Sequence, residues 1–196
     1  MNDSLQKLLS ELEQFGESND QNNNERSHRM LNITRDTGEF LSVLIRATNA
    51  QRILEIGTSN GYSTLWLADA SHAIGGEVTT VELSDRKFNM AAKNFSRSNL
   101  SSIIKQVHGN AGNLLSDTED NAYDLIFLDS ERPEYPGWWP DLRRVIRPGG
   151  LLVVDNAISH PDEMAPFISL VESDQNFTTS LVPVGKGEYL ATRAKS

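Results

Sequence analysis

The chain has 196 residues, of which 27 are Asp or Glu and 18 are Lys or Arg, so its formal net charge is −9. This length suits one domain with its own hydrophobic core. Without a basic tract to neutralise phosphates, the charge argues against a nucleic-acid partner. The absence of cysteine excludes disulfides and thiol chemistry. We see no signal-peptide pattern and no apolar run of membrane-spanning length, and therefore expect a cytoplasmic protein with no membrane partner.

Residues 1–33 are predicted to form an amphipathic helix followed by a polar linker. From Ser4 to Phe15, apolar residues recur at helical spacing and gather on one face. From Gly16 to Glu25 the chain is polar and rich in asparagine, which is typical of a mobile linker. The helix could dock on the domain, cover an active site, or pair with another subunit. Docking is the simplest interpretation, and pairing would give a homodimer.

Residues 34–196 alternate between short apolar runs and amphipathic segments. Strands are expected at Arg52–Ile56, Glu77–Glu82, Ile103–Val107, Asp124–Leu128 and Leu151–Val154. Helices are expected at Thr37–Thr48, Tyr62–Ala70, Asp85–Arg97 and Pro161–Glu172, and Pro140–Val145 is expected to form part of another. Two further strands meet at Gly185–Gly187, which reads as a hairpin. The pattern predicts an α/β fold with a doubly wound, mostly parallel, seven-stranded sheet that ends in an antiparallel C-terminal hairpin.

The stretch Ile53–Thr64 has the pattern of a strand, a glycine turn and the start of a helix. Such a turn lets a ligand approach the backbone and directs free helix N–H groups toward it. Gly57 and Gly61 have the spacing G-x-x-x-G, and Ser59 stands where a dinucleotide fingerprint needs its middle glycine. The stretch instead resembles the cofactor turn of S-adenosylmethionine (SAM)-dependent O-methyltransferases of the catechol and caffeoyl-CoA type. A turn without any ligand is the alternative.

This resemblance extends from about Thr34 to Arg193 and implies a SAM site at the carboxyl ends of the strands. Ser63 matches the position that hydrogen-bonds the methionine carboxylate, although it could simply cap the helix. Glu82 matches the acid that accepts hydrogen bonds from the ribose hydroxyls. Leu83 would pack on adenine or under the next helix. The implied cofactor residues are Glu55, Gly57, Thr58, Ser59, Gly61, Ser63, Glu82, Leu83, Asn110, Ala111 and Asp129.

Asn110 departs from the family pattern, which often has aspartate at this position. An asparagine keeps a carbonyl acceptor for the adenine amino group, so adenine contact is still expected. A helix N-cap is the equally good alternative for Asn110.

Three oxygen-bearing residues match the metal ligands of the cation-dependent members of this family. Asp129 follows the fourth strand, and Asp155 and Asn156 follow the fifth. Oxygen donors on neighbouring strand ends suit Mg²⁺, which prefers octahedral oxygen coordination. The cation would act as a Lewis acid that lowers the pKa of the acceptor hydroxyl. In the alternative, a metal-free enzyme, Asp129 would orient the cofactor.

The candidate catalytic residues are Asp129, Arg132 and His160. In the best-known members a lysine three residues after the strand-four aspartate accepts the substrate proton, and Arg132 occupies that position here. Guanidinium stays charged in proteins and cannot act as a base. The metal alone could acidify the hydroxyl, His160 could take the proton, or Arg132 could bind an anionic group of the substrate.

An aromatic loop follows the strand-four aspartate. Tyr135, Trp138 and Trp139 could form an apolar wall beside the metal, or the tryptophans could pack the next helix onto the sheet.

The sequence thus predicts a SAM-dependent O-methyltransferase that acts on a small hydroxylated molecule with the help of a divalent cation, with Mg²⁺ the expected one. Three other functions stay open. They are a metal-independent methyltransferase of the same fold, a nicotinamide or flavin oxidoreductase, and a non-catalytic cofactor-binding protein. The acceptor cannot be read from the sequence, because loops set its specificity.

Overall fold

The computed structural model describes residues 1–195. Its helices are α1 (Asp3–Asn22), α2 (Arg35–Thr48), α3 (Tyr62–His72), α4 (Asp85–Ser98), α5 (Ala111–Asp117), α6 (Tyr135–Val145) and α7 (Pro161–Ser173). Single turns of 3-10 helix lie at η1 (Arg26–His28), η2 (Ser101–Ile103) and η3 (Arg132–Glu134). Its strands are β1 (Arg52–Ile56), β2 (Glu77–Glu82), β3 (Ile104–His108), β4 (Tyr123–Leu128), β5 (Ile146–Val154), β6 (Phe177–Val182) and β7 (Glu188–Arg193).

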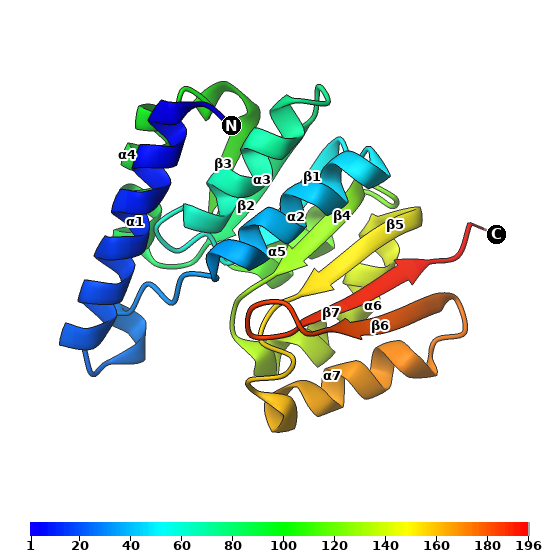
Figure 1. The fold of residues 1–196 in the computed structure, drawn as a ribbon. Helices are drawn as coiled ribbons and strands as arrows, with labels where there is room; N and C mark the ends of the chain where they lie inside the picture. Colours follow the sequence, from blue (N-terminus) through cyan, green and yellow to red (C-terminus); the bar gives the residue numbers. More distant parts are fainter. Residues whose placement is uncertain (196) are drawn as a thin grey trace.

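The strands form a seven-stranded sheet in the order β3-β2-β1-β4-β5-β7-β6 (Figure 1). β1 to β5 run parallel, whereas β7 lies antiparallel between β5 and β6. The chain order reverses between β1 and β4, so the carboxyl ends of these two strands flank a crevice of the kind in which open α/β sheets bind ligands. The predicted α/β fold with its antiparallel C-terminal hairpin is confirmed.

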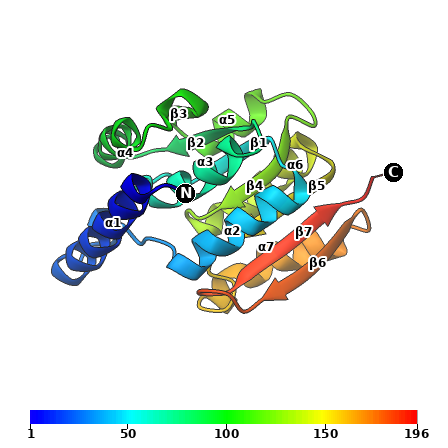
Figure 2. The same cartoon turned by 45° about the horizontal axis from the view of Figure 1, so that its top comes forward.

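Helices cover both faces of the sheet, and for this reason the central strands are mostly apolar. Successive residues of a strand point to opposite faces. In β1, Ile53 belongs to the core shared with α2, α3 and α4, and Leu54 to the core shared with α5, α6 and α7. Figure 2 shows α2 and α3 in front of the sheet, on the side from which α1 also packs.

The prediction of a mobile linker after Phe15 is wrong as far as Asn22, because α1 continues to that residue. The polar side chains of this stretch have partners that local composition does not reveal. The Asp20 carboxylate accepts hydrogen bonds from the backbone N–H groups of Met30 at 2.6 Å and Leu31 at 2.8 Å. The chain therefore folds back on the end of α1 instead of hanging free.

The apolar face of α1 docks on the domain itself. Its side chains pack in the core that includes α3 and α4, and Figure 1 shows α1 alongside α4. The buried members are Leu5, Leu8, Leu9 and Leu12. Phe15, expected on the same face, is exposed. Docking is thus the correct one among the three interpretations of this helix.

Several element bounds differ from expectation. The short helix α5 was foreseen only through the N-cap alternative for Asn110, the helix that contains Pro140–Val145 begins at Tyr135, and β5 begins at Ile146 instead of Leu151. No helix in residues 1–195 combines the length and the hydropathy that a membrane crossing requires.

Candidate active site

A cavity of about 520 Å³ opens at the carboxyl ends of β1, β2, β3 and β4. It is lined by most of the residues that the sequence assigned to a cofactor: Gly57, Thr58, Ser59, Ser63, Glu82, Leu83, Asn110, Ala111 and Asp129. Glu55 and Gly61 are not among the lining residues. The carboxyl ends of these strands thus border one cavity, as predicted from the positions of these residues directly after the strands.

The glycine turn brings β1 against the end of β4. Gly57 has a φ of +109°, and a Cβ atom at this position would lie 2.0 Å from the carbonyl oxygen of Asp129. A side chain at Gly57 is excluded both by this contact and by the backbone conformation. The backbone N–H groups of Gly57 and Thr58 point to the carbonyl oxygen of Val81 in β2. The turn is therefore fixed to both neighbouring strands.

Glu55 lies beneath the turn and supports it instead of facing a ligand. Its carboxylate is fully buried and accepts hydrogen bonds from the hydroxyls of Ser63 at 2.5 Å, Thr80 at 2.6 Å and Thr64. Burial raises the pKa of Glu55 to about 7, although the three hydroxyl donors act in the opposite direction. The expected direct contact of Glu55 with the cofactor is thus replaced by a positioning role.

The same hydrogen bonds constrain Ser63. Because its hydroxyl donates to Glu55, Ser63 faces the cavity as a hydrogen-bond acceptor. An acceptor suits an ammonium group better than the carboxylate that the sequence resemblance assigned to this position.

Glu82 projects from the end of β2 beside the turn. Its Oε2 accepts from the N–H of Ser59 at 2.8 Å, and its Oε1 accepts from the N–H of Ser84 at 2.9 Å. These two bonds fix the carboxylate at the cavity wall and leave lone pairs for a ligand. Leu83 follows with 69% of its surface exposed, so it is not packed under the next helix.

Asn110 both lines the cavity and begins α5. Its Oδ1 accepts a hydrogen bond from the N–H of Asn113 at 3.2 Å, which is an N-cap contact. Its amide N–H₂ group is left to donate to a ligand. The capping alternative is therefore correct for Asn110 and does not exclude contact with adenine.

The segment between α1 and α2 covers the cavity, which sequence reasoning missed. The residues that line it there are Arg26, Ser27, Met30, Leu31, Asn32 and Ile33. The hydroxyl of Ser59 donates to the carbonyl oxygen of Met30 at 2.7 Å and so ties this segment to the glycine turn. Met30 and Ile33 are buried apolar residues close to a polar stretch, which was the available signal.

The three predicted metal ligands lie together. The Nδ2 of Asn156 donates to Oδ2 of Asp155 at 2.8 Å and to Oδ1 of Asp129 at 3.2 Å. Burial and the charge of Asp155 raise the pKa of Asp129 well above its ordinary value. Burial also raises the pKa of Asp155. The Nδ2 group of Asn156 therefore lies between the two carboxylates.

The donor set fits a hard cation once the amide turns. The Oδ1 of Asn156 now accepts from the hydroxyl of Ser159 at 3.3 Å. A 180° rotation of the amide would present Oδ1 to the two carboxylates and Nδ2 to Ser159, whose hydroxyl can also accept. Within residues 1–195 no three His, Cys, Asp or Glu side chains form a metal-binding group, so the candidate ligands are two carboxylates and one amide.

A further acid, Glu188, lies beside this cluster and was also missed. It is fully buried at the start of β7, and its Oε1 accepts from the hydroxyl of Thr37 in α2 at 3.0 Å. Burial, and next the charge of Asp155, raise the pKa of Glu188 to about 10. Nothing local in the sequence marks a residue whose partner lies 151 positions away.

Neither Arg132 nor His160 lines the cavity. Arg132 is buried, and its Nε donates to Oε2 of Glu163 in α7 at 2.8 Å. This pairing argues against the alternative that Arg132 binds an anionic group of the substrate. The Nδ1 of His160 lies 2.8 Å from the hydroxyl of Ser159. Burial and the nearby Arg132 lower the pKa of His160, which favours its neutral form.

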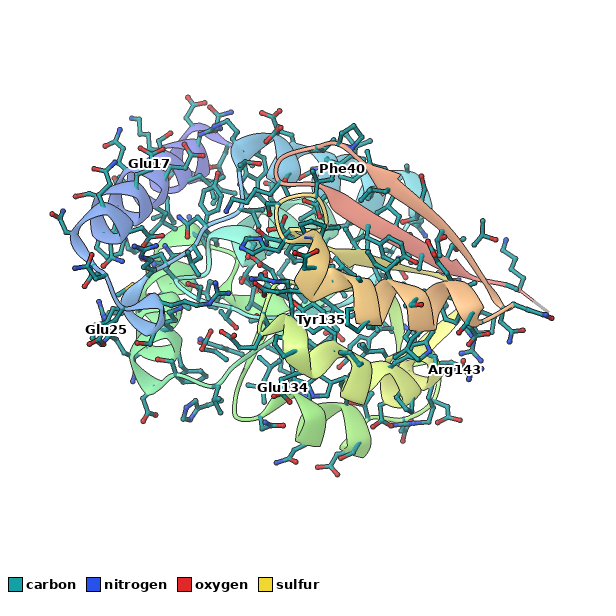
Figure 3. All side chains as sticks on the ribbon, turned by 90° about the horizontal axis from the view of Figure 1, so that it is seen from below. Glu17, Glu25, Phe40, Glu134, Tyr135 and Arg143 are labelled. Atoms are coloured by element: carbon teal, nitrogen blue, oxygen red, sulfur yellow. The ribbon has the colours of Figure 1, made fainter. Side chains whose placement is uncertain are left out.

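In the aromatic loop, one tryptophan lines the cavity and the other packs the next helix onto the sheet, so each of the two interpretations holds for one of them. Trp138 lines the cavity, whereas Trp139 is buried and packs edge-on against Phe167 of α7. The hydroxyl of Tyr135 accepts from the N–H of Ser130 at 2.7 Å and so holds the loop after Asp129. Figure 3 shows Tyr135 near the centre of the molecule and Glu25 at its edge.

This strand order, with a cavity bounded by the glycine turn and Glu82, defines the class as the seven-stranded methyltransferase fold. The family model described as O-methyltransferase matches residues 3–194. The chain therefore belongs to the O-methyltransferase family and is an O-methyltransferase by class. The match includes α1, which lay outside the resemblance seen in the sequence.

Individual relatives agree with this assignment. A catechol O-methyltransferase of Niastella koreensis is 35% identical over 131 residues, which cover 65% of this chain and 59% of that protein, less than two thirds of its length. The O-methyltransferase TomG of Streptomyces achromogenes, solved in complex with SAM, is 25% identical with a TM-score of 0.78 and covers 99% of this chain and 91% of that one. The fold is also that of a Bacillus cereus O-methyltransferase solved in complex with SAH, at 24% identity and a TM-score of 0.80, covering 98% and 91% of the two chains.

Proposed function

We propose that this O-methyltransferase transfers a methyl group from SAM to a hydroxyl group of a small molecule, assisted by a divalent cation. The observation that carries the proposal is that Asp129 belongs both to the cavity and to the candidate cation site. This residue lines the cavity and also contacts the Asn156 amide that joins it to Asp155. A methyl donor in the cavity would therefore lie next to the cation site, which in-line transfer requires.

Different cavity residues would contact different parts of SAM, the methyl donor. Glu82, fixed by two backbone N–H groups, would accept hydrogen bonds from the ribose hydroxyls. Asn110 and Leu83 would border the adenine. Ser63 would accept from the ammonium group of the methionine part. The segment from Arg26 to Ile33 would exclude water from this end of the cavity.

Asp129, Asp155 and Asn156 would hold the cation. When bound, the cation supplies Lewis acidity that lowers the pKa of the acceptor hydroxyl. Arg132 remains paired with Glu163 and adds a fixed positive charge that favours ionised Asp129. The lowered pKa of His160 favours its neutral form, which could receive the released proton, with the hydroxyl of Ser159 between its Nδ1 and Asn156.

Binding of SAM tests the first half of the proposal. We expect Glu82→Gln to weaken SAM affinity about tenfold or more, because a hydrogen bond to a charged group is lost. Isothermal titration calorimetry measures this affinity. The matched control is Glu77→Gln, which removes the same charge from the exposed start of the same strand. Equal affinities of the Glu82 variant and the wild type would contradict the assigned cavity.

Binding of Mn²⁺ to SAM-loaded protein tests the second half. Electron paramagnetic resonance should detect one Mn²⁺ site per chain, and Asp155→Ala should abolish it. Turnover of a vicinal aromatic diol should then require the cation and stop with EDTA. A wild-type protein that binds SAM but no Mn²⁺, and whose turnover is indifferent to EDTA, would favour the metal-independent methyltransferase instead.

The proposal also covers assembly and acceptor class. We expect a small-molecule acceptor instead of nucleic acid, because the net charge of −9 would repel phosphates. A homodimer is expected by analogy with the family and is tested by analytical ultracentrifugation. The apolar face of α1 would not form that dimer, since it is buried within the chain.

A further inference from the structure

Asn60 is a polar residue of the glycine turn to which the sequence resemblance assigns no role. It is fully buried and lines the cavity, as do its neighbours Ser59 and Tyr62. Its carbonyl oxygen accepts a hydrogen bond from the Nδ2 of Asn94 in α4 at 2.8 Å. The backbone of Asn60 is therefore fixed by a helix outside the turn.

The contacts of the Asn60 amide distinguish its oxygen from its nitrogen. The Oδ1 accepts a hydrogen bond from the backbone N–H of Tyr62, the first residue of α3, at 3.1 Å. Only an oxygen can accept this bond, so the other end of the amide is the nitrogen. This Nδ2 is buried and has no hydrogen-bond partner among residues 1–195. Because a buried donor without a partner is costly, the folded chain leaves one contact of Asn60 to be completed.

The amide lies at the N-terminus of α3, where a negatively charged group is stabilised. The N–H groups in the first turn of a helix have no acceptor within the helix, and the helix dipole adds partial positive charge there. α3 has 11 residues, and Ser63 of its first turn lines the cavity together with Asn60. The helix terminus and the unpartnered amide therefore favour the same kind of ligand group, an anion.

The methionine part of SAM carries such a group. It ends in an ammonium and a carboxylate. The hydroxyl of Ser63 donates to Glu55 and therefore suits the ammonium as an acceptor. The carboxylate needs hydrogen-bond donors, and Asn60 offers one three residues before Ser63. One short stretch of chain thus provides an acceptor and a donor for the two charged groups.

The cationic residues of the cavity lining belong to other segments. Arg26 of η1 forms an ion pair with Glu131 at 3.7 Å. Lys87 lies in the first turn of α4, and its N–H donates to the Oγ of Ser84, the residue that caps this helix. Within the glycine turn, a carboxylate would therefore meet the Asn60 amide and the N–H groups of α3.

We propose that Asn60 binds the carboxylate of the methionine part of SAM through its Nδ2, together with the N–H groups at the start of α3. This residue would make the cavity selective for a cofactor with an amino-acid group. The inference rests on the proposed SAM-dependent function and deepens it. If Asn60 only held the turn through Oδ1, an aspartate would serve equally well, because its carboxylate also accepts from helix N–H groups.

The experiment measures the affinities of SAM and decarboxylated SAM for the wild type and for Asn60→Asp by isothermal titration calorimetry. Decarboxylated SAM keeps the adenosine, the sulfonium and the ammonium. Aspartate keeps the acceptor for Tyr62 and replaces Nδ2 with an oxygen, and the helix N-terminus should keep it ionised at about pH 7.5. We expect SAM to bind about 100-fold more weakly, because a charge-assisted bond is lost and two carboxylates meet. Decarboxylated SAM should bind with unchanged or higher affinity.

Asn2→Asp is the matched control. Asn2 caps the start of α1 in the same manner, with its Oδ1 accepting from the N–H of Leu5 at 2.9 Å, but it does not line the cavity. This variant should bind both ligands as the wild type does. Asn60→Ala guards against misfolding of the aspartate variant, since it removes the donor without adding charge. It should weaken SAM binding roughly tenfold and leave decarboxylated SAM unaffected.

Two kinds of result would overturn the role of Asn60 and leave the SAM site standing. In the first, the Asn60 variants keep their SAM affinity or lose affinity equally for both ligands, so that Asn60 only supports the turn. In the second, the wild type binds decarboxylated SAM as tightly as SAM. A wild-type protein that binds neither ligand would overturn the proposed SAM site as well, so the two failures are distinguishable.

Discussion

Single side chains beneath the cofactor turn account for much of its rigidity. The Glu55 carboxylate accepts hydrogen bonds from three hydroxyl groups. At Gly57, the backbone of Asp129 occupies the space that a side chain would fill. The turn is thus held by buried polar contacts that a ligand never touches. Buried networks of this kind stabilise only when each member is satisfied.

Glu55 gives the fold a pH dependence of unusual sign. The folded pKa of about 7 lies above the ordinary value of 4.5, so the folded protein holds this proton more tightly than the unfolded chain. The contribution to stability is complete below about pH 4.5 and is lost as the pH rises to about 7. We expect a loss of about 3 kcal/mol across this window.

Urea unfolding of the wild type and Glu55→Gln between pH 4.5 and 8 measures this loss. Carboxyl groups with lowered pKa, of which Asp124 is one, act in the opposite direction but contribute equally to both proteins. The difference between the two unfolding free energies should therefore change by the Glu55 contribution alone. Parallel pH profiles would show that the pKa of Glu55 does not differ between the folded and unfolded states.

Residues that act at strand ends were predictable, and residues that act across the sheet were not. Gly57, Glu82 and Asp129 follow apolar runs, so their convergence comes from the rule that parallel strands share a carboxyl edge. Glu188 contacts Thr37 across 151 residues, and Arg132 contacts Glu163 across 31. Such pairs depend on strand order and register, which short sequence patterns do not specify.

At the scale of elements, the segment between α1 and α2 is the largest departure from expectation. Polar composition suggested a mobile linker from Gly16 to Glu25, but α1 continues to Asn22, and Asp20 fixes the following segment, which covers the cavity. Leu31 within it has a φ of +54°, a conformation that costs a non-glycine residue free energy. The two hydrogen bonds from the N–H groups of Met30 and Leu31 to the Asp20 carboxylate therefore hold the segment in a strained reversal.

Asp20→Asn tests how far this segment shapes the cavity. Replacing one carboxylate oxygen with a donor removes one of the two bonds to Met30 and Leu31, and we expect stability to fall by about 1–2 kcal/mol. Because Met30 and Leu31 line the cavity, SAM affinity in calorimetry should also fall. The matched control is Glu17→Gln, an exposed change on the same helix that Figure 3 places at the surface.

A loss of stability in the Asp20 variant with unchanged SAM affinity would mean that the segment is a structural cap only. The short helix α5 shows why the bounds of such an element escape sequence analysis. It has seven residues, Ala111–Asp117, so its periodicity is too brief to separate from a loop.

At the scale of the whole molecule, α1 and the sheet domain share one core. The leucines of α1 belong to the same cluster as Ile53 of β1 and Leu125 of β4. A helix that shares a core should not unfold by itself. We therefore predict a single unfolding transition, with equal calorimetric and van't Hoff enthalpies.

Leu9→Ala sharpens this prediction. Leu9 is fully buried, so its truncation should destabilise the entire protein by roughly 2–5 kcal/mol and lower that one transition temperature. Val43→Ala, which truncates an exposed residue of α2, provides the control. Two separate transitions, with only the first shifted by Leu9→Ala, would establish the N-terminal helix as an independent unit.

The different positions of the three tryptophans have a spectroscopic consequence. Trp66 and Trp139 are buried, whereas Trp138 alone among the three lines the cavity. An occupant of the cavity changes the polarity around one indole and leaves the other two in constant surroundings. The chain thus carries an intrinsic optical reporter, whose emission follows occupancy in real time without any added label.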